Sequence, residues 1–206
     1  MKKKKVRANK KIHAAALELL RSPDFLYQVR RLVGAAGVVG EHENRLILYL
    51  ACLTGYLDRE VSVLVKGPSS TGKSNLVKTV LSLIPPEKLL TRSSFSRKAL
   101  AYGEEDLAGK ILYLVEHRGG KDGELFRRLL QSEGELHHEA TTGSGQNRGT
   151  QVKRRIGAPV FISTTTDERV YADDETRFLS IRADESAELT REVVRDQFSK
   201  KRKGKI

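Results

Sequence analysis

One stretch of the chain has the residue types and spacing needed to hold phosphate groups. In GPSSTGKS the pattern G-x-x-x-x-G-K-[ST] is complete, with Gly67, Gly72, Lys73 and Ser74 at its defining positions. Glycines let backbone amides turn toward phosphates, the Lys73 ammonium adds charge at the β and γ phosphates, and the Ser74 hydroxyl can ligate magnesium. We expect ATP and Mg²⁺ to bind through Gly67, Pro68, Ser69, Ser70, Thr71, Gly72, Lys73, Ser74 and Asn75, although Asn75 also suits a purely helical role.

A second stretch, ILYLVEH, ends in a carboxylate that could act on water. Strands of this kind normally supply an aspartate near magnesium and often a glutamate that orients the attacking water. Either Glu116 is that glutamate and Val115 stands where the aspartate should be, or Glu116 replaces the aspartate and His117 takes the glutamate position. We favour the first arrangement. A site that binds nucleotide without hydrolysing it is the third reading.

Two downstream positions could complete a hydrolytic site. The strand VFISTTT ends in hydroxyls, of which Thr165 is one that could sense the γ-phosphate, but threonines also favour strands for packing reasons. Arg177 begins the next expected strand and could reach a nucleotide on a neighbouring subunit. Alternatively, Arg177 forms a surface ion pair with Asp174 or Glu175.

A basic hairpin is expected between residues 135 and 157. Alternating residues flank a glycine-rich turn, and four cations lie on the turn and the descending strand: Arg148, Lys153, Arg154 and Arg155. A protruding hairpin with this charge is suited to gripping a nucleic-acid backbone. The alternative is a solvated hairpin whose charges prevent edge-to-edge aggregation.

These residues require a scaffold of alternating strands and helices. From residue 61 onward, short apolar strands alternate with amphipathic helices, which predicts an α/β fold with a mostly parallel sheet covered on both faces. Helical periodicity before that point predicts a basic tail and helical preface over residues 1–57. The ATPase core then covers residues 58–185, and a C-terminal helix and basic tail follow over residues 186–206.

Composition limits the classes of partner. The chain has 206 residues and a net charge of +12, and lysine runs at both ends carry much of the excess. A surplus of this size suits a polyanion such as nucleic acid. The single cysteine, Cys52, lies in an apolar segment and is expected to be a buried thiol. No apolar run approaches the ~20 residues that span a bilayer, so we expect a cytoplasmic protein with no membrane partner.

Several stretches together resemble the AAA+ P-loop ATPase module, especially the minichromosome maintenance helicase branch and the helicase part of bacterial and phage primase-helicases. The resemblance covers about residues 45–185 and rests on GPSSTGKS, ILYLVE, LLQSEGEL, the basic hairpin, VFISTTT and ETRFLSI. It implies a three-layer sandwich with an inserted β-hairpin. It also implies roles for Glu116 as catalytic glutamate, Thr165 as sensor and Arg177 as arginine finger in trans. Val115 departs from the acidic residue that is usual in this family, which puts metal affinity and turnover in doubt.

The expected function is therefore an ATP-dependent DNA helicase or translocase motor of a replicating mobile element. The resemblance implies a homo-oligomer such as a hexameric ring, with single-stranded or forked DNA and a primase as partners. A nucleotide-gated DNA-binding or loading factor with little hydrolysis is the alternative. A small-molecule kinase fits less well, because the basic hairpin has no function there.

Overall fold

The structure is a computed structural model that describes residues 10–57, 59–92, 107–115, 135–142, 149–156, 159–167 and 175–202. Four residues singled out above lie outside these ranges: Glu116, His117, Arg148 and Asp174. The apolar spacing of GELFRRLLQ predicts a helix over residues 123–131, and that segment also lies outside them.

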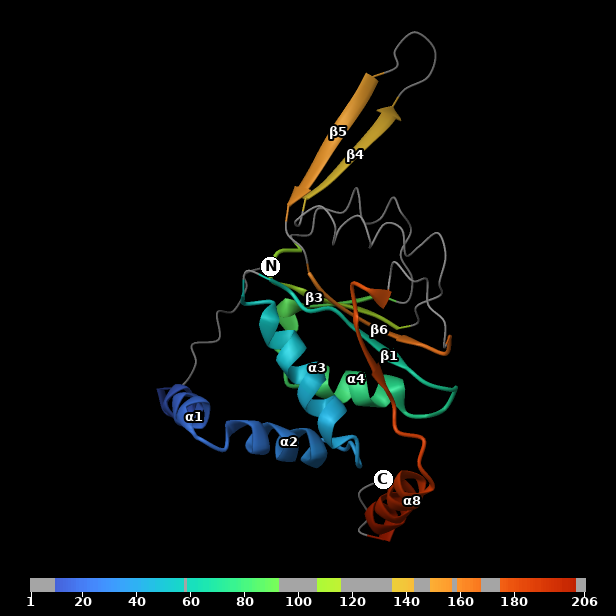
Figure 1. Ribbon diagram of the computed structural model, residues 1–206. Helices are drawn as coiled ribbons and strands as arrows, with labels where there is room; N and C mark the ends of the chain where they lie inside the picture. The colour runs from blue at the N-terminus through green and yellow to red at the C-terminus, as the bar shows by residue number, and fades with distance from the viewer. Residues whose placement is uncertain are drawn as a thin grey trace.

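A five-stranded parallel sheet forms the centre of the fold (Figure 1). Its strands are β1 (Val63–Lys66), β2 (Leu89–Arg92), β3 (Ile111–Leu114), β6 (Val160–Thr165) and β7 (Leu179–Arg182). Their order is β2-β3-β6-β1-β7, and all neighbouring strands run parallel. The expected α/β class is therefore confirmed. Because β6 lies between β1 and β3, the threonines that end β6 lie between the phosphate loop and the end of β3.

Three helices share a single core with the sheet. They are α2 (Phe25–Ala35), α3 (His42–Thr54) and α4 (Lys73–Leu81), and Figure 1 shows α3 and α4 beside the strands. In α4 the buried residues Leu76, Val77 and Val80 recur at helical spacing, which places them on one side of the helix. They pack with Val65 and Tyr113 of the sheet.

Every residue of β1, β3 and β6 is buried, so both faces of the sheet are covered. This explains why these strands are continuous apolar runs rather than alternating ones. The sequence did not predict β2, which has only four residues and lies half-buried at the edge of the sheet. Arg177, expected to begin a strand, lies instead in the turn before β7.

The expected hairpin is present as a separate two-stranded sheet. Strands β4 (Glu135–Thr142) and β5 (Gly149–Ile156) pair antiparallel, and Figure 1 shows them projecting from the parallel sheet. Two further helices are α1 (Lys10–Arg21) and α8 (Ala187–Arg202), and a short 3-10 helix covers Pro86–Lys88. Among the described residues, no helix has the length and apolar character needed to cross a membrane. The division of the chain at residues 57 and 185 stays a prediction.

Candidate nucleotide-binding site

The phosphate loop connects the carboxyl end of β1 to the first turn of α4. Its backbone takes positive φ angles at Gly67 (150°), Ser70 (68°) and Gly72 (82°). Such turns direct successive amides toward the hollow of the loop, where they can bind an anion. A side chain at Gly67 would also crowd the Thr71 hydroxyl, 3.3 Å from the added Cβ, so the loop requires glycine there.

Lys73 lies across this hollow and is nearly buried, with 8 % of the residue exposed. Its Nζ donates to the carbonyl oxygen of Gly67 at 2.6 Å and to that of Pro68. Burial lowers the pKa of Lys73 below its ordinary value, and the charge of Glu185 opposes that shift. These contacts hold a cation at the loop, where phosphate oxygens can replace the carbonyl acceptors.

Ser74 occupies the first turn of α4 and is half-buried. The hydroxyl of Tyr113 in β3 is buried and has no partner by hydrogen-bond geometry among the described residues. Burial raises the pKa of Tyr113, while the nearby Ser74 hydroxyl opposes the rise. The described residues contain no group of three or more metal-binding side chains. Ser74 therefore fits a magnesium ion held mainly by nucleotide phosphates and water.

The end of β3 is apolar where an aspartate was expected. Val115 is half-buried and packs against the core cluster that contains Tyr113. The Thr164 hydroxyl donates to the Val115 carbonyl at 2.5 Å, which ties β6 to the end of β3. Thr165 is 2 % exposed and accepts a hydrogen bond from the Asp167 amide at 3.1 Å. No described residue accepts the proton of the Thr165 hydroxyl, so this hydroxyl can donate a hydrogen bond to a ligand.

A cavity of about 740 Å³ continues from the phosphate loop. Its lining contains loop residues 68–72, the segment before α3, and one side of α8. Apolar side chains give it a wall suited to a nucleobase: Val38, Val39, Leu76, Leu189, Val193 and Val194. The sequence did not indicate that these residues line a cavity. They come from distant segments, since Val39 and Leu189 are about 150 residues apart, and only Leu76 lies in a helix that follows the phosphate loop.

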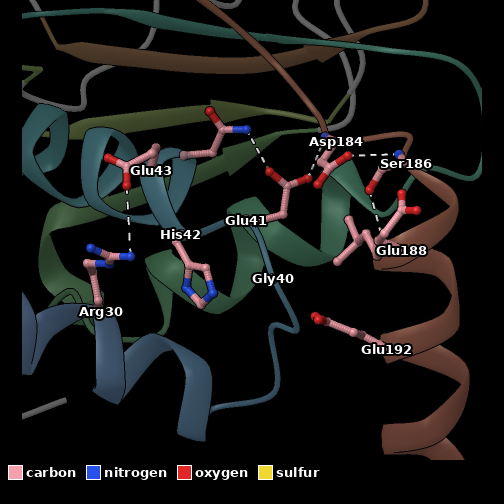
Figure 2. Close-up of a pocket in the computed structure, with 11 residues that line it drawn as sticks. Arg30, Gly40, Glu41, His42, Glu43, Asp184, Ser186, Glu188 and Glu192 are labelled. Atoms are coloured by element: carbon pink, nitrogen blue, oxygen red, sulfur yellow. Dashed lines mark hydrogen bonds and ion pairs between the residues drawn. The ribbon is translucent and has the colours of Figure 1, made fainter.

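Polar side chains fix the walls of this cavity. The Arg45 guanidinium is buried and donates to the Val38 carbonyl at 2.7 Å. Glu41 accepts from the Asp184 amide at 2.9 Å and from Asn44, whose amide also donates to the Arg182 carbonyl at 2.7 Å. Figure 2 shows Glu41 between the start of α3 and the segment that leads into α8. The segment before α3 is thereby linked to both β7 and α8.

A second, acidic pocket of about 480 Å³ adjoins these contacts (Figure 2). Carboxylates of Glu43, Glu188 and Glu192 line it, together with Arg30 and His42. Its charge is opposite to what a nucleotide phosphate requires. We therefore place the nucleotide at the phosphate loop and the cavity beside it.

Arg177 and the basic hairpin, which are expected to contact a neighbouring subunit and nucleic acid, lie only partly within the described residues. Arg177 is half-buried, and its Nε has no hydrogen-bond partner among the described residues. Glu175, one of its two expected ion-pair partners, is bonded to Lys66. On the hairpin, Lys153, Arg154 and Arg155 of β5 face His138, His137 and Leu136 of β4 in the strand register.

A parallel sheet, a glycine loop with Lys73 and Ser74, and a cavity beside the loop define a nucleotide-binding P-loop NTPase domain. Residues 14–206 match the family described as the MTBMA_p00010 P-loop domain, and the chain belongs to that family. No curated protein matches the chain.

Proposed function

We propose that this domain is an ATP-driven DNA helicase or translocase motor of a replicating mobile element, and that it acts as a ring-type homo-oligomer. The observation that carries nucleotide use is the continuity of the phosphate loop with the apolar cavity of about 740 Å³. The loop would hold the phosphates and Lys73 would neutralise their charge. The cavity wall formed by Val39 and Leu189 would take the base.

Hydrolysis in this proposal depends on residues at the carboxyl ends of β3 and β6. Ser74 would hold magnesium, which would supply charge stabilisation on the phosphates. Thr165 has a proton to offer to a γ-phosphate oxygen or to the attacking water. Glu116 would orient that water, since it follows directly after Val115 at the end of β3.

Two features support a nucleic-acid partner and assembly. The hairpin projects from the sheet and carries Lys153, Arg154 and Arg155 on one strand, in a chain of net charge +12. The half-buried guanidinium of Arg177, whose Nε has no partner among the described residues, could complete a neighbour's site. A primase is the further partner that the resemblance implies.

A nucleotide-gated DNA-binding or loading factor is the second candidate. The apolar packing of Val115 favours it, because no carboxylate supports the metal at that position. Nucleotide binding would then tighten DNA binding or assembly with little turnover.

ATP turnover with magnesium, in the presence and absence of single-stranded and forked DNA, separates these functions. We expect DNA-stimulated turnover that Glu116→Gln and Arg177→Ala each abolish. Turnover that ignores DNA and Arg177→Ala would contradict the motor, and nucleotide binding without turnover would favour the loading factor.

The hairpin is tested by changing Lys153, Arg154 and Arg155 together to glutamine. A matched control removes the same number of charges at exposed Arg21, Arg31 and Lys78. Loss of DNA stimulation in the first variant only would support a specific contact, whereas equal loss in both would indicate non-specific charge attraction.

A further inference from the structure

We propose that Glu41 is a positioning residue that holds the start of α8 against the cavity beside the phosphate loop, and that binding of the base and sugar depends on this link. The inference rests on the proposed function, because it concerns the cavity that would take the base. Glu41 lies immediately before α3 and lines this cavity together with Asp184 and Leu189. Its side chain therefore lies where the segment before α3 meets the segment before α8.

The Glu41 carboxylate joins two segments that are 143 residues apart in the sequence. One of its oxygens accepts from the Asp184 amide at 2.9 Å, and the other accepts from the Asn44 side chain at 2.6 Å. The Asn44 side chain also donates to the carbonyl of Arg182, the last residue of β7, at 2.7 Å. Both carboxylate oxygens thus link the start of α3 to the end of β7 and the residues after it.

From Asp184 the hydrogen bonds continue into the first turn of α8 (Figure 2). The Asp184 carboxylate accepts from the Ser186 amide at 2.8 Å, and the Ser186 hydroxyl accepts from the Leu189 amide at 3.1 Å. Ser186 thereby caps α8, and Leu189 of the capped turn lines the cavity. The position of Glu41 is therefore transmitted to an apolar side chain of the cavity wall.

The backbone of Glu41 is an independent reason to assign a role to its side chain. Glu41 has φ 53° and ψ 34°, in the left-handed region. Glycine takes this conformation without strain, and the chain has glycine at the nearby positive-φ positions Gly37 and Gly40. A glutamate in this region is strained, and such strain persists where the surrounding structure fixes the residue. The two hydrogen bonds of the carboxylate are the contacts that glycine at position 41 could not make.

Calorimetry with two probes separates the cavity from the phosphate loop. ATP would engage both, whereas inorganic tripolyphosphate would engage the loop alone, so the ratio of their affinities measures the contribution of the base and sugar. The variants are Glu41→Ala, Glu41→Gly and Glu41→Gln, each with Mg²⁺. Glu43→Ala is the matched control, because it removes the same charge from the same acidic pocket, and Glu43 pairs with Arg30 of α2.

We expect Glu41→Ala and Glu41→Gly to lower ATP affinity about five- to tenfold relative to tripolyphosphate affinity, because each removes both hydrogen bonds. Glu41→Gln keeps an oxygen acceptor for the Asp184 amide and should lose less. Glu43→Ala should leave the ratio of the two affinities unchanged.

Thermal unfolding without nucleotide separates positioning from stability. Glu41→Gly should unfold at a higher temperature than Glu41→Ala, since glycine relieves the left-handed strain, yet it should lose as much ATP affinity. ATP affinity that instead follows the unfolding temperature across the variants would show that Glu41 acts on stability alone, and would overturn the inference.

Equal losses of ATP and tripolyphosphate affinity, or the same change of their ratio in Glu43→Ala, would also overturn the positioning role. If the unmodified protein bound ATP no more tightly than tripolyphosphate, this inference would fail while phosphate binding at the loop stood. Failure of the unmodified protein to bind either probe would overturn the proposed function as well.

Discussion

Lys66 and Glu175 form an ion pair on the strand that leads into the phosphate loop. Lys66 is the last residue of β1, and only 9 % of its side chain is exposed. Glu175 comes from the turn that carries Arg177 and is half-exposed. The pair therefore joins the phosphate loop to the turn that we propose faces a neighbouring subunit.

The two halves of this pair should respond differently to substitution. Glu175→Gln leaves a buried ammonium without its counter-ion, and we expect the free energy of unfolding to fall by about 1–2 kcal/mol, less than for a fully buried pair. Lys66→Met removes the buried charge, and the remaining carboxylate can be hydrated, so its cost should be under about 1 kcal/mol. Urea unfolding measures both.

The surface pair of Arg30 and Glu43, 3.8 Å apart, is the control for that comparison. Because the Glu43 side chain is 78 % exposed, Glu43→Gln should change stability by less than about 0.5 kcal/mol. Equal effects of Glu43→Gln and Glu175→Gln would show that burial of Lys66 contributes nothing.

The elements that could be predicted from the sequence are those with local signals. The phosphate loop, α3 ending beside Gly55, and the buried runs of β1, β3 and β6 each have a spacing that one segment specifies. The pairing of Lys66 with Glu175 joins residues 109 apart, and the cavity joins Val39 to Leu189. No local pattern encodes such long-range contacts. The sequence did not predict strand β2 because its four residues, three half-buried and one exposed, are too few to show a clear alternation.

Gly40 lines the acidic pocket and should be more sensitive to substitution than Gly37, which lines the neighbouring cavity. Its φ is +59°, and an added Cβ would collide with Leu189 Cδ1 of α8. Gly37 has φ +118° but open space around it, so Gly37→Ala reports backbone strain alone, about 1–2 kcal/mol. We expect Gly40→Ala to cost more in thermal unfolding and to weaken nucleotide binding, because the Leu189 side chain, which lines the cavity, or α8 itself must shift.

Combining Gly40→Ala with Leu189→Ala should remove the collision. In that background the cost of Gly40→Ala should fall to that of Gly37→Ala. An unchanged cost would mean that α8 does not press on Gly40.

Cys52 should make stability decrease in alkali. Burial raises the pKa of this thiol from 9.0 to about 12, so between these values the folded chain keeps a proton that the unfolded chain releases. The free energy of unfolding should then fall by up to about 1.4 kcal/mol per pH unit above pH 9. Cys52→Ala should be roughly 1–2 kcal/mol less stable at pH 7.

The difference in the free energy of unfolding between the unmodified protein and Cys52→Ala isolates the contribution of the thiol, because Tyr49 and Tyr113 titrate in both proteins. Urea unfolding at intervals from pH 7 to pH 11 should show a shallower decline for Cys52→Ala. Parallel curves would contradict a buried, protonated thiol.

Thr164 and Thr165 are adjacent on β6, but we expect their substitutions to have different effects. Thr164 should matter for stability, and Thr165 should matter for ATP turnover. The Thr164 proton is committed to the Val115 carbonyl, so Thr164→Val should lower stability by about 1 kcal/mol and leave turnover within about threefold. The Thr165 proton has no acceptor among the described residues and can serve the transition state. Thr165→Val should therefore reduce turnover at saturating ATP by about 100-fold, as removal of a single stabilising donor does elsewhere. Turnover assays with unfolding curves for both variants check this, and comparable loss of turnover in the two would exclude Thr165 as a specific sensor.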